Sequence, residues 1–156
     1  MVTKQGQIKK TEREQFAKVR RSGLIALGLK GDDELEWVKG SSGKDDVIIT
    51  TAKGQAIRFK EKDIRAMGRT AAGVRAIRLK KDDHVVGMDL IAEGKATTDE
   101  QLLVVTEKGY GKRSKLTEYK VQGRGGSGIK TANITGKTGN IVAAAIVNNA
   151  QEQDII

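Results

Sequence analysis

The chain has 156 residues, which is the size of one ordinary domain with its own core. Lysine and arginine total 29 against 20 aspartates and glutamates, and the net charge of +9 points to a polyanionic partner, nucleic acid before an anionic membrane surface. Cysteine is absent and His84 is the single histidine, which excludes disulfides and zinc modules.

The chain is expected to stay in the cytoplasm. No stretch approaches the roughly 18 apolar residues of a membrane-spanning helix, and the N-terminal residues 1–10 lack the apolar core of a signal peptide. We therefore expect no membrane partner.

One pattern recurs three times along the chain. Its first block is a threonine, a glycine three residues later and a basic residue four further on: Thr3-Gly6-Lys10, Thr51-Gly54-Arg58 and Thr106-Gly109-Arg113. A second glycine with an apolar residue behind it follows each time, and ten residues later comes a turn-compatible residue: Gly23, Gly73 and Gly128, then Asp33, Asp83 and Thr138. The pattern predicts a single domain of three repeats, about 3–50, 51–105 and 106–156, and this period is typical of propellers.

The elements expected between the glycines are short strands. Alternating or β-branched runs occupy residues 47–50, 74–79, 102–106 and 141–146, and each Thr-x-x-Gly block predicts a tight hairpin. About four strands per repeat make one blade, so we expect an all-β, propeller-like fold. The absence of a long helical period disfavours a helical solenoid.

Apolar residues at strand spacing are assigned to blade packing rather than to a ligand site. They are Trp37, Phe59, Ile64, Ile77, Leu79, Val85, Val86 and Leu103. His84 is expected at the surface or in a turn.

The charge separates by block. Residues 3–30, 51–81 and 106–130 carry +6, +8 and +5, whereas 31–50, 82–105 and 131–156 carry −4, −5 and −1. Equivalent blocks occupy equivalent positions in a repeat fold, so we expect a basic band, which suits the backbone of bent duplex DNA. With two phenylalanines, two tyrosines and one tryptophan, stacking platforms for single strands are poorly supplied.

Three motifs are similar to those of enzyme sites, but each lacks the residues or the structural context that the site requires. Residues 123–128 fit G-x-G-x-x-G, but no helix is expected after them, and residues 136–138 end like a Walker A loop whose first glycine is replaced by Thr131. The acidic pairs 32–33 and 82–83 recur as turn residues. We therefore expect no catalytic residue, no cofactor and no metal site.

Residues 55–61, 64–74 and 109–113 resemble the C-terminal domain of DNA gyrase A subunits. The resemblance covers all three repeats. It implies a β-pinwheel, a six-bladed propeller variant whose blades exchange strands, so that three four-stranded blades are half a disc. It also implies DNA wrapping within an ATP-dependent type II topoisomerase, whose remaining parts, the N-terminal portion of gyrase A together with gyrase B, would be the partners. The cleaving tyrosine of that family lies in a separate N-terminal domain, so neither Tyr110 nor Tyr119 is expected to cut DNA.

Residues 122–128 resemble the gyrase box of this family, which the family needs for wrapping. Gly123 and Ser127 stand where the box has basic residues, and the box normally lies in the first blade. We therefore interpret this segment, with the functional box itself as the alternative, as a box-like loop of a later blade: Gln122, Gly123, Arg124, Gly125, Gly126, Ser127 and Gly128. The residues expected to contact DNA are Lys9, Lys10, Arg20, Arg21, Arg58, Lys60, Arg65, Arg69, Arg75, Lys112, Arg113, Lys115, Arg124 and Lys130.

Assembly and parentage have alternatives. Residues 153–156 align with 46–49, which suggests a chain that ends between two strands of one blade, and open sheet edges invite a homodimer that completes a six-bladed ring. A truncated domain is the plain alternative. The related domain of topoisomerase IV, or a basic propeller that binds an acidic protein, would share these features.

Overall fold

The computed structural model describes residues 1–94 and 99–148. The expected match of residues 153–156 to 46–49 falls outside them. The strands are β1 Val2–Thr3, β2 Gln7–Ile8, β3 Leu35–Trp37, β4 Asp46–Thr51, β5 Gln55–Lys60, β6 Val74–Arg75, β7 Val85–Ile91, β8 Glu100–Thr106, β9 Gly111–Lys115, β10 Ile129–Lys130 and β11 Ile141–Asn148. Three short 3-10 helices accompany them, η1 Arg13–Phe16, η2 Glu61–Asp63 and η3 Leu116–Glu118. The fold is all-β, as predicted.

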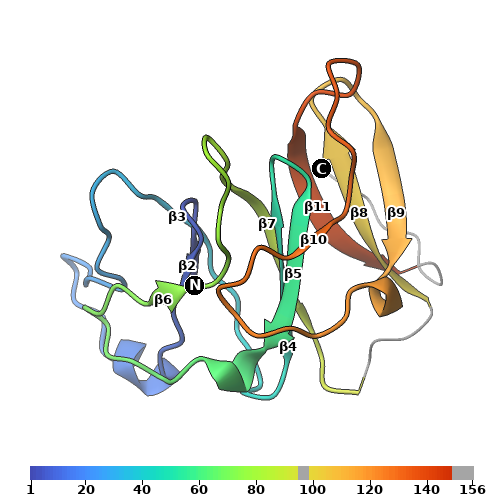
Figure 1. Ribbon diagram of the computed structural model, residues 1–156. Coiled ribbons are helices and arrows are strands. Elements are labelled where there is room, and N and C mark those ends of the chain that lie inside the picture. Colours follow the sequence, from blue (N-terminus) through green and yellow to red (C-terminus); the bar gives the residue numbers. More distant parts are fainter. Residues whose placement is uncertain (95–98, 149–156) are drawn as a thin grey trace.

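The strands form three antiparallel sheets that stand in a row (Figure 1). Their strand orders are β3-β1-β2-β6, β10-β5-β4-β7 and β11-β8-β9. In the first two sheets, one edge strand comes from the following repeat: β6 pairs with β2, and β10 pairs with β5. The repeats therefore exchange strands, as the resemblance implied.

A shared side-chain network closes the hairpins. Gly54 has φ +80°, the left-handed conformation that the turn requires, and the Thr51 hydroxyl accepts a hydrogen bond from the Gln55 amide (3.3 Å). Asp83 accepts from the Thr51 hydroxyl (2.8 Å) and the Lys53 amide (2.9 Å). The predicted hairpin is thus confirmed, and the aspartate ten residues beyond the second glycine fixes it.

One predicted strand is much shorter than expected. Residues 74–79 were predicted as a strand, yet only Val74–Arg75 pair. The Ala76 amide donates to Gly6 (2.8 Å) and the Arg78 amide to Gly126 (2.8 Å), so the backbone bonds of this segment go to two different loops. The other predicted strands lie within β4, β8 and β11.

The core consists of two apolar clusters, one on each side of β4. Phe59, Ile64, Ile77 and Val85 are buried in the first, with Trp37 and Leu79 packed against it. Val86 packs against the second, and Leu103 is half-buried. His84 is exposed, as expected. In the part of the chain that the structure describes, no helix is long and apolar enough to cross a membrane.

Candidate DNA-binding surface

Three equivalent loops carry 11 of the 29 lysines and arginines. We call residues 9–23, 61–73 and 116–128 the crossover segments, because each leaves a hairpin and ends at the second glycine of its repeat. The helices η1, η2 and η3 lie on these segments, along the lower side of the molecule in Figure 1. The crossover segments therefore present equivalent parts of successive repeats on a shared side.

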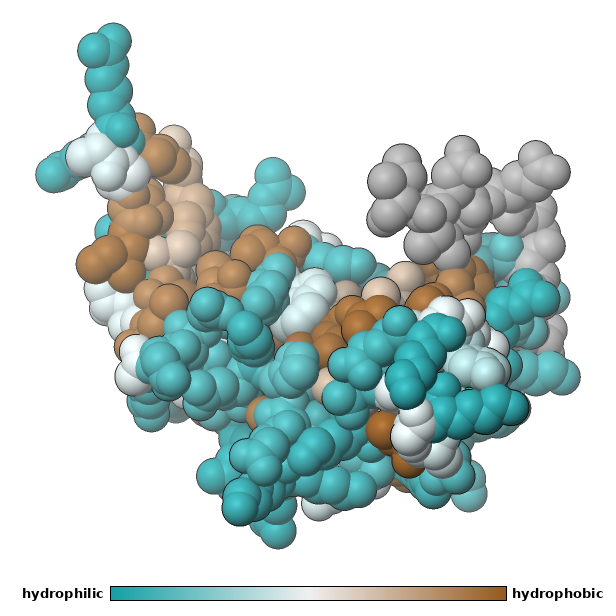
Figure 2. All heavy atoms as spheres, turned by 90° about the horizontal axis from the view of Figure 1, so that it is seen from above, coloured by the Kyte–Doolittle hydropathy of each residue, from teal (hydrophilic) through white to brown (hydrophobic). Residues whose placement is uncertain are grey.

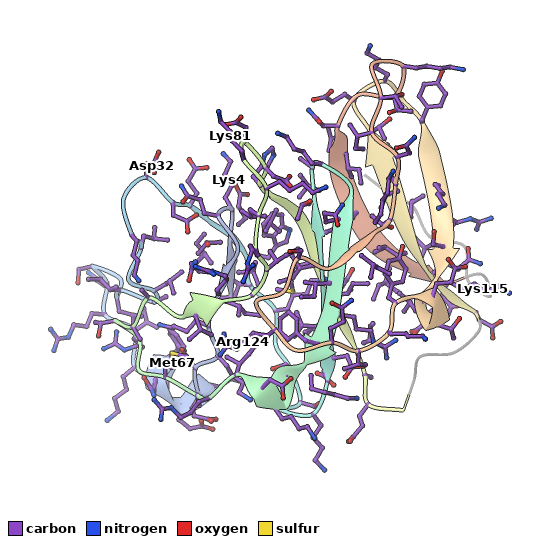
Figure 3. The ribbon with its side chains drawn as sticks, viewed as in Figure 1. Lys4, Asp32, Met67, Lys81, Lys115 and Arg124 are labelled. Atoms are coloured by element: carbon purple, nitrogen blue, oxygen red, sulfur yellow. The ribbon has the colours of Figure 1, made fainter. Side chains whose placement is uncertain are left out.

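Nine of the fourteen predicted contact residues are exposed, and they come from all three repeats. They are Arg20, Arg21, Arg65, Arg75, Lys112, Arg113, Lys115, Arg124 and Lys130. Figure 3 shows Lys115 at the far end of the third sheet, pointing away from it. Four others are half-buried: Lys10, Arg58, Lys60 and Arg69.

Lys9 is buried, with 1% of its surface exposed. Its ammonium donates to the carbonyls of Ala26 (2.7 Å), Gly68 (3.0 Å), Ala71 (3.2 Å) and Arg69. Burial, and then the positive charge of Arg69, lower the pKa of Lys9, while the carbonyl oxygens favour its charged form. In this structure Lys9 joins the first crossover to the second and offers no charge to a phosphate.

Three further basic residues face carboxylates of the same chain. Asp46, 2% exposed, accepts from Arg58 Nε (2.8 Å) and lies 2.8 Å from the ammonium of Lys60. Lys10 lies 3.8 Å from the buried carboxylate of Glu61. The charge available at the surface is therefore concentrated in the exposed residues.

Several acidic residues of the connecting segments point inward. Asp33 and Asp45 are buried. Asp33 accepts from the Gln5 amide (2.9 Å), and hydrogen bonds from the Ser42 hydroxyl and amide lower the pKa of Asp45. Because these carboxylates satisfy backbone and side-chain donors inside the fold, they take little negative charge to the surface.

The box-like loop lies over the second repeat. Gly125 donates to Ala76 (2.7 Å), and the Gln122 amide donates to Arg58 (2.8 Å). Arg124 is exposed (Figure 3), but its guanidinium donates to the carbonyls of Asp63 in the second crossover (3.3 Å) and of Arg75 in β6 (2.9 Å). The Gly125 amide is thus used within the chain, and Arg124 both braces the loop and presents its charge.

The tyrosines differ in exposure. Tyr119 is buried and its hydroxyl bonds to the Thr131 hydroxyl. Tyr110 is 44% exposed, and the Lys137 ammonium lies 5.6 Å from the centre of its ring.

The sequence patterns did not predict which basic residues have hydrogen-bond or ion-pair partners within the chain. Lys9 occupies the repeat position that Ile57 holds in the second repeat, and Ile57 is fully buried. The alignment gave no clear signal for Lys9, because the third repeat has the exposed Lys112 at the same position. The pairing of Asp46 with Arg58 had no signal either.

The comparisons identify the fold and the relatives. A family model described as the DNA gyrase C-terminal domain, beta-propeller, matches residues 1–39, 45–92 and 100–148. The DNA gyrase A protein of Staphylococcus epidermidis is 43% identical over 154 residues, and that of Staphylococcus aureus is 42% identical. The match covers 99% of this chain and 17% of each relative.

Two solved structures share the arrangement. The C-terminal domain of DNA topoisomerase IV has a TM-score of 0.86 at 30% identity, and the match covers 94% of this chain and 45% of that one. A DNA gyrase A C-terminal domain has a TM-score of 0.74 at 27% identity, with 94% of this chain and 47% of that one covered.

Proposed function

Because the chain belongs to the DNA gyrase C-terminal domain family, we propose that it binds duplex DNA through its exposed basic residues and bends the duplex around them. The observation that carries the proposal is the distribution of those nine residues over all three repeats, while acidic residues such as Asp33, Asp45 and Asp46 are buried. Basic residues distributed over successive repeats suit a repeating phosphate backbone.

The proposed mechanism is electrostatic. Lysine and arginine side chains neutralise phosphates and release counterions, which gives strong salt dependence and little sequence preference. Bending a short duplex costs on the order of several kcal/mol, which contacts from successive repeats must offset. No step of this mechanism needs a bond to be broken.

The setting that we propose is a type II topoisomerase. The chain spans 17% of the length of the gyrase A relatives that it matches, and the family model covers only their C-terminal domain. We propose that it supports supercoiling beside the remainder of gyrase A and beside gyrase B, in the cytoplasm at the nucleoid. The likeness to a topoisomerase IV domain keeps that enzyme as the alternative setting.

We also propose that two copies of the chain associate. In this proposal the three repeats hold basic residues along an arc, and a second copy would extend it. A longer arc contacts more phosphates and so binds and bends DNA more strongly.

Arg65→Glu tests the DNA contact. Arg65 is exposed on the second crossover, whereas Arg69 donates to Ile25 (3.4 Å) and lies beside Lys9, so Arg65 is the cleaner position. We expect the affinity for any random duplex, measured by fluorescence anisotropy, to fall about 5- to 10-fold and the salt slope to decrease by about 1.

The matched control is Lys44→Glu, the same charge change at an exposed lysine of the acidic segment 31–50. It should leave binding within about twofold, because net charge alone contributes little at moderate salt. No binding of the unaltered chain at low salt would overturn the proposal and leave an acidic protein as the partner.

A further inference from the structure

A cavity of about 630 Å³ lies between the first two sheets. Its walls come from β2, β3, β4 and β7 and from the first two crossover segments. The apolar part of the lining includes Ile8, Leu35, Val47, Ile64, Met88 and Leu90. A cavity of this volume with a largely apolar lining is typical of a small-molecule site.

Two hydrogen-bond donors in the lining have bonding capacity left. Thr11 lines the cavity, and its hydroxyl oxygen is buried without a hydrogen-bond partner among residues 1–94 and 99–148. The ammonium of Lys10 lies 3.4 Å from the Glu61 carbonyl oxygen and 3.8 Å from the Glu61 carboxylate, and both distances are long for a hydrogen bond. Because unpaired buried polar groups are rare in folded proteins, the Thr11 hydroxyl marks a place for a further molecule.

The acidic side chain beside these donors already has its partners. Glu61 is 3% exposed and accepts hydrogen bonds from the Ser41 hydroxyl (2.6 Å) and from the amides of Gly43 (3.0 Å) and Asp45 (3.3 Å). It thereby fixes a loop that borders the cavity. The bonding capacity that remains is that of donors, and it favours a ligand that carries an acceptor.

The second junction between repeats has apolar packing at the corresponding place. The repeat positions of Glu61 and Ile64 are held by Leu116 and Tyr119 in the third repeat. Both are buried in the second apolar cluster, with 0% and 3% exposed. The fold therefore does not require a buried carboxylate at this position.

We propose that the cavity binds a small carboxylate with an aliphatic body. The body lies against the apolar side chains of the two sheets, and the carboxylate oxygens accept from the Thr11 hydroxyl and the Lys10 ammonium. This site goes beyond the proposed function and does not depend on DNA binding.

The test needs a signal from the cavity itself, because other apolar side chains reach the surface. Val19, Ile25 and Leu29 are 63%, 64% and 49% exposed in the first repeat, where apolar side chains gather at the left end of Figure 2. Met88 is 5% exposed in the cavity wall, and the chain has three methionines, so labelled methyl groups give a simple spectrum. An aliphatic probe on the exposed patch leaves the Met88 methyl signal unchanged.

Octanoate, octanol and octylammonium share one tail and differ in the head group. We expect octanoate to shift the Met88 methyl signal saturably, with a dissociation constant of about 1 mM or lower. Octanoate should bind about tenfold more tightly than octanol, because charge-assisted hydrogen bonds to the carboxylate are the stronger ones. Octylammonium should bind most weakly, since it brings a cation to the Lys10 ammonium.

Thr11→Val tests the hydroxyl donor. The hydroxyl has no partner in the described chain, so the midpoint of thermal unfolding should not fall, whereas octanoate binding should weaken about 5- to 10-fold. The matched control is Thr117→Val, the same change at an exposed threonine outside the cavity. It should leave the octanoate affinity within about twofold.

A Met88 signal that does not respond to octanoate would overturn the proposal and leave the cavity to water. Equal affinities for octanol and octanoate, or octanoate binding that survives Thr11→Val, would contradict recognition of a carboxylate. Tighter binding of octylammonium would do the same and would make Glu61 the recognition group. All of these measurements are made without DNA, so their failure leaves the proposed function standing.

Discussion

The ammonium of Lys9 shows how a residue that resembles a DNA contact can belong to the fold. It is fully enclosed and donates to four carbonyls, of which Ala26 belongs to the first repeat and the others to the second crossover. We expect Lys9→Met to lower the free energy of unfolding by about 2–4 kcal/mol, because it removes the donor from four partly buried carbonyls and leaves the site of the ammonium, which lines a cavity, without a charge. Urea unfolding followed by circular dichroism measures this.

Lys112→Met is the matched control for Lys9→Met. Lys112 occupies the same repeat position in the third repeat, but it is exposed and donates to a single carbonyl, that of Thr131 (3.3 Å). The change should cost less than about 0.5 kcal/mol in stability. Equal losses of stability at the two positions would show that the hydrogen bonds from Lys9 to the four carbonyls do not stabilise the fold.

At the level of elements, the exchanged strands depend on glycine at the point of contact. In Gly128→Ala the new Cβ would meet the Ala56 oxygen at 2.4 Å, at a residue with φ +70°. We expect a loss of about 3 kcal/mol or more in stability, because the β10–β5 pair must separate as well as adopt an unfavourable φ.

Gly23→Ala separates the two causes of that loss. Its φ is +75°, but no described atom lies within 4 Å of the new Cβ. In dilute solution it should cost only about 1 kcal/mol, the backbone term alone. Thermal unfolding of both variants measures the two losses in stability. If Gly23→Ala lost as much stability as Gly128→Ala, the close contact between Gly128 and Ala56 would not be the cause.

The same elements show what could be predicted from sequence. The hairpins were predictable because threonine, glycine and the later aspartate act within one repeat at fixed spacing, as Thr51, Gly54 and Asp83 do. The length of β6 was not, because its partner is chosen by contacts with the first repeat, nearly 70 residues away along the chain. Local sequence patterns determine the hairpins, whereas the exchange of strands depends on contacts between residues far apart in the sequence.

At the level of the whole molecule, the block charges indicated where basic residues gather but not which of them face solvent. Arg58 and Lys60 belong to a basic block, yet both are committed to Asp46 in the neighbouring acidic block. A count along the sequence treats such pairs as free charges. Only the folded arrangement separates them from exposed residues such as Arg65 and Lys130.

Bending of the duplex distinguishes a curved basic surface from one that binds DNA by charge alone. Duplex DNA has a persistence length of about 150 base pairs, so a free duplex of about 40 base pairs is nearly straight. If the exposed basic residues of successive repeats hold phosphates along an arc, binding should bring the duplex ends closer. We expect energy transfer between dyes on the two ends to rise as the chain is added and to fall back with salt, together with the anisotropy signal.

Arg65→Glu should reduce the transfer at saturating protein, whereas Lys44→Glu should not. Binding without any change in transfer would mean that the duplex lies straight across the surface and that the chain binds DNA without bending it.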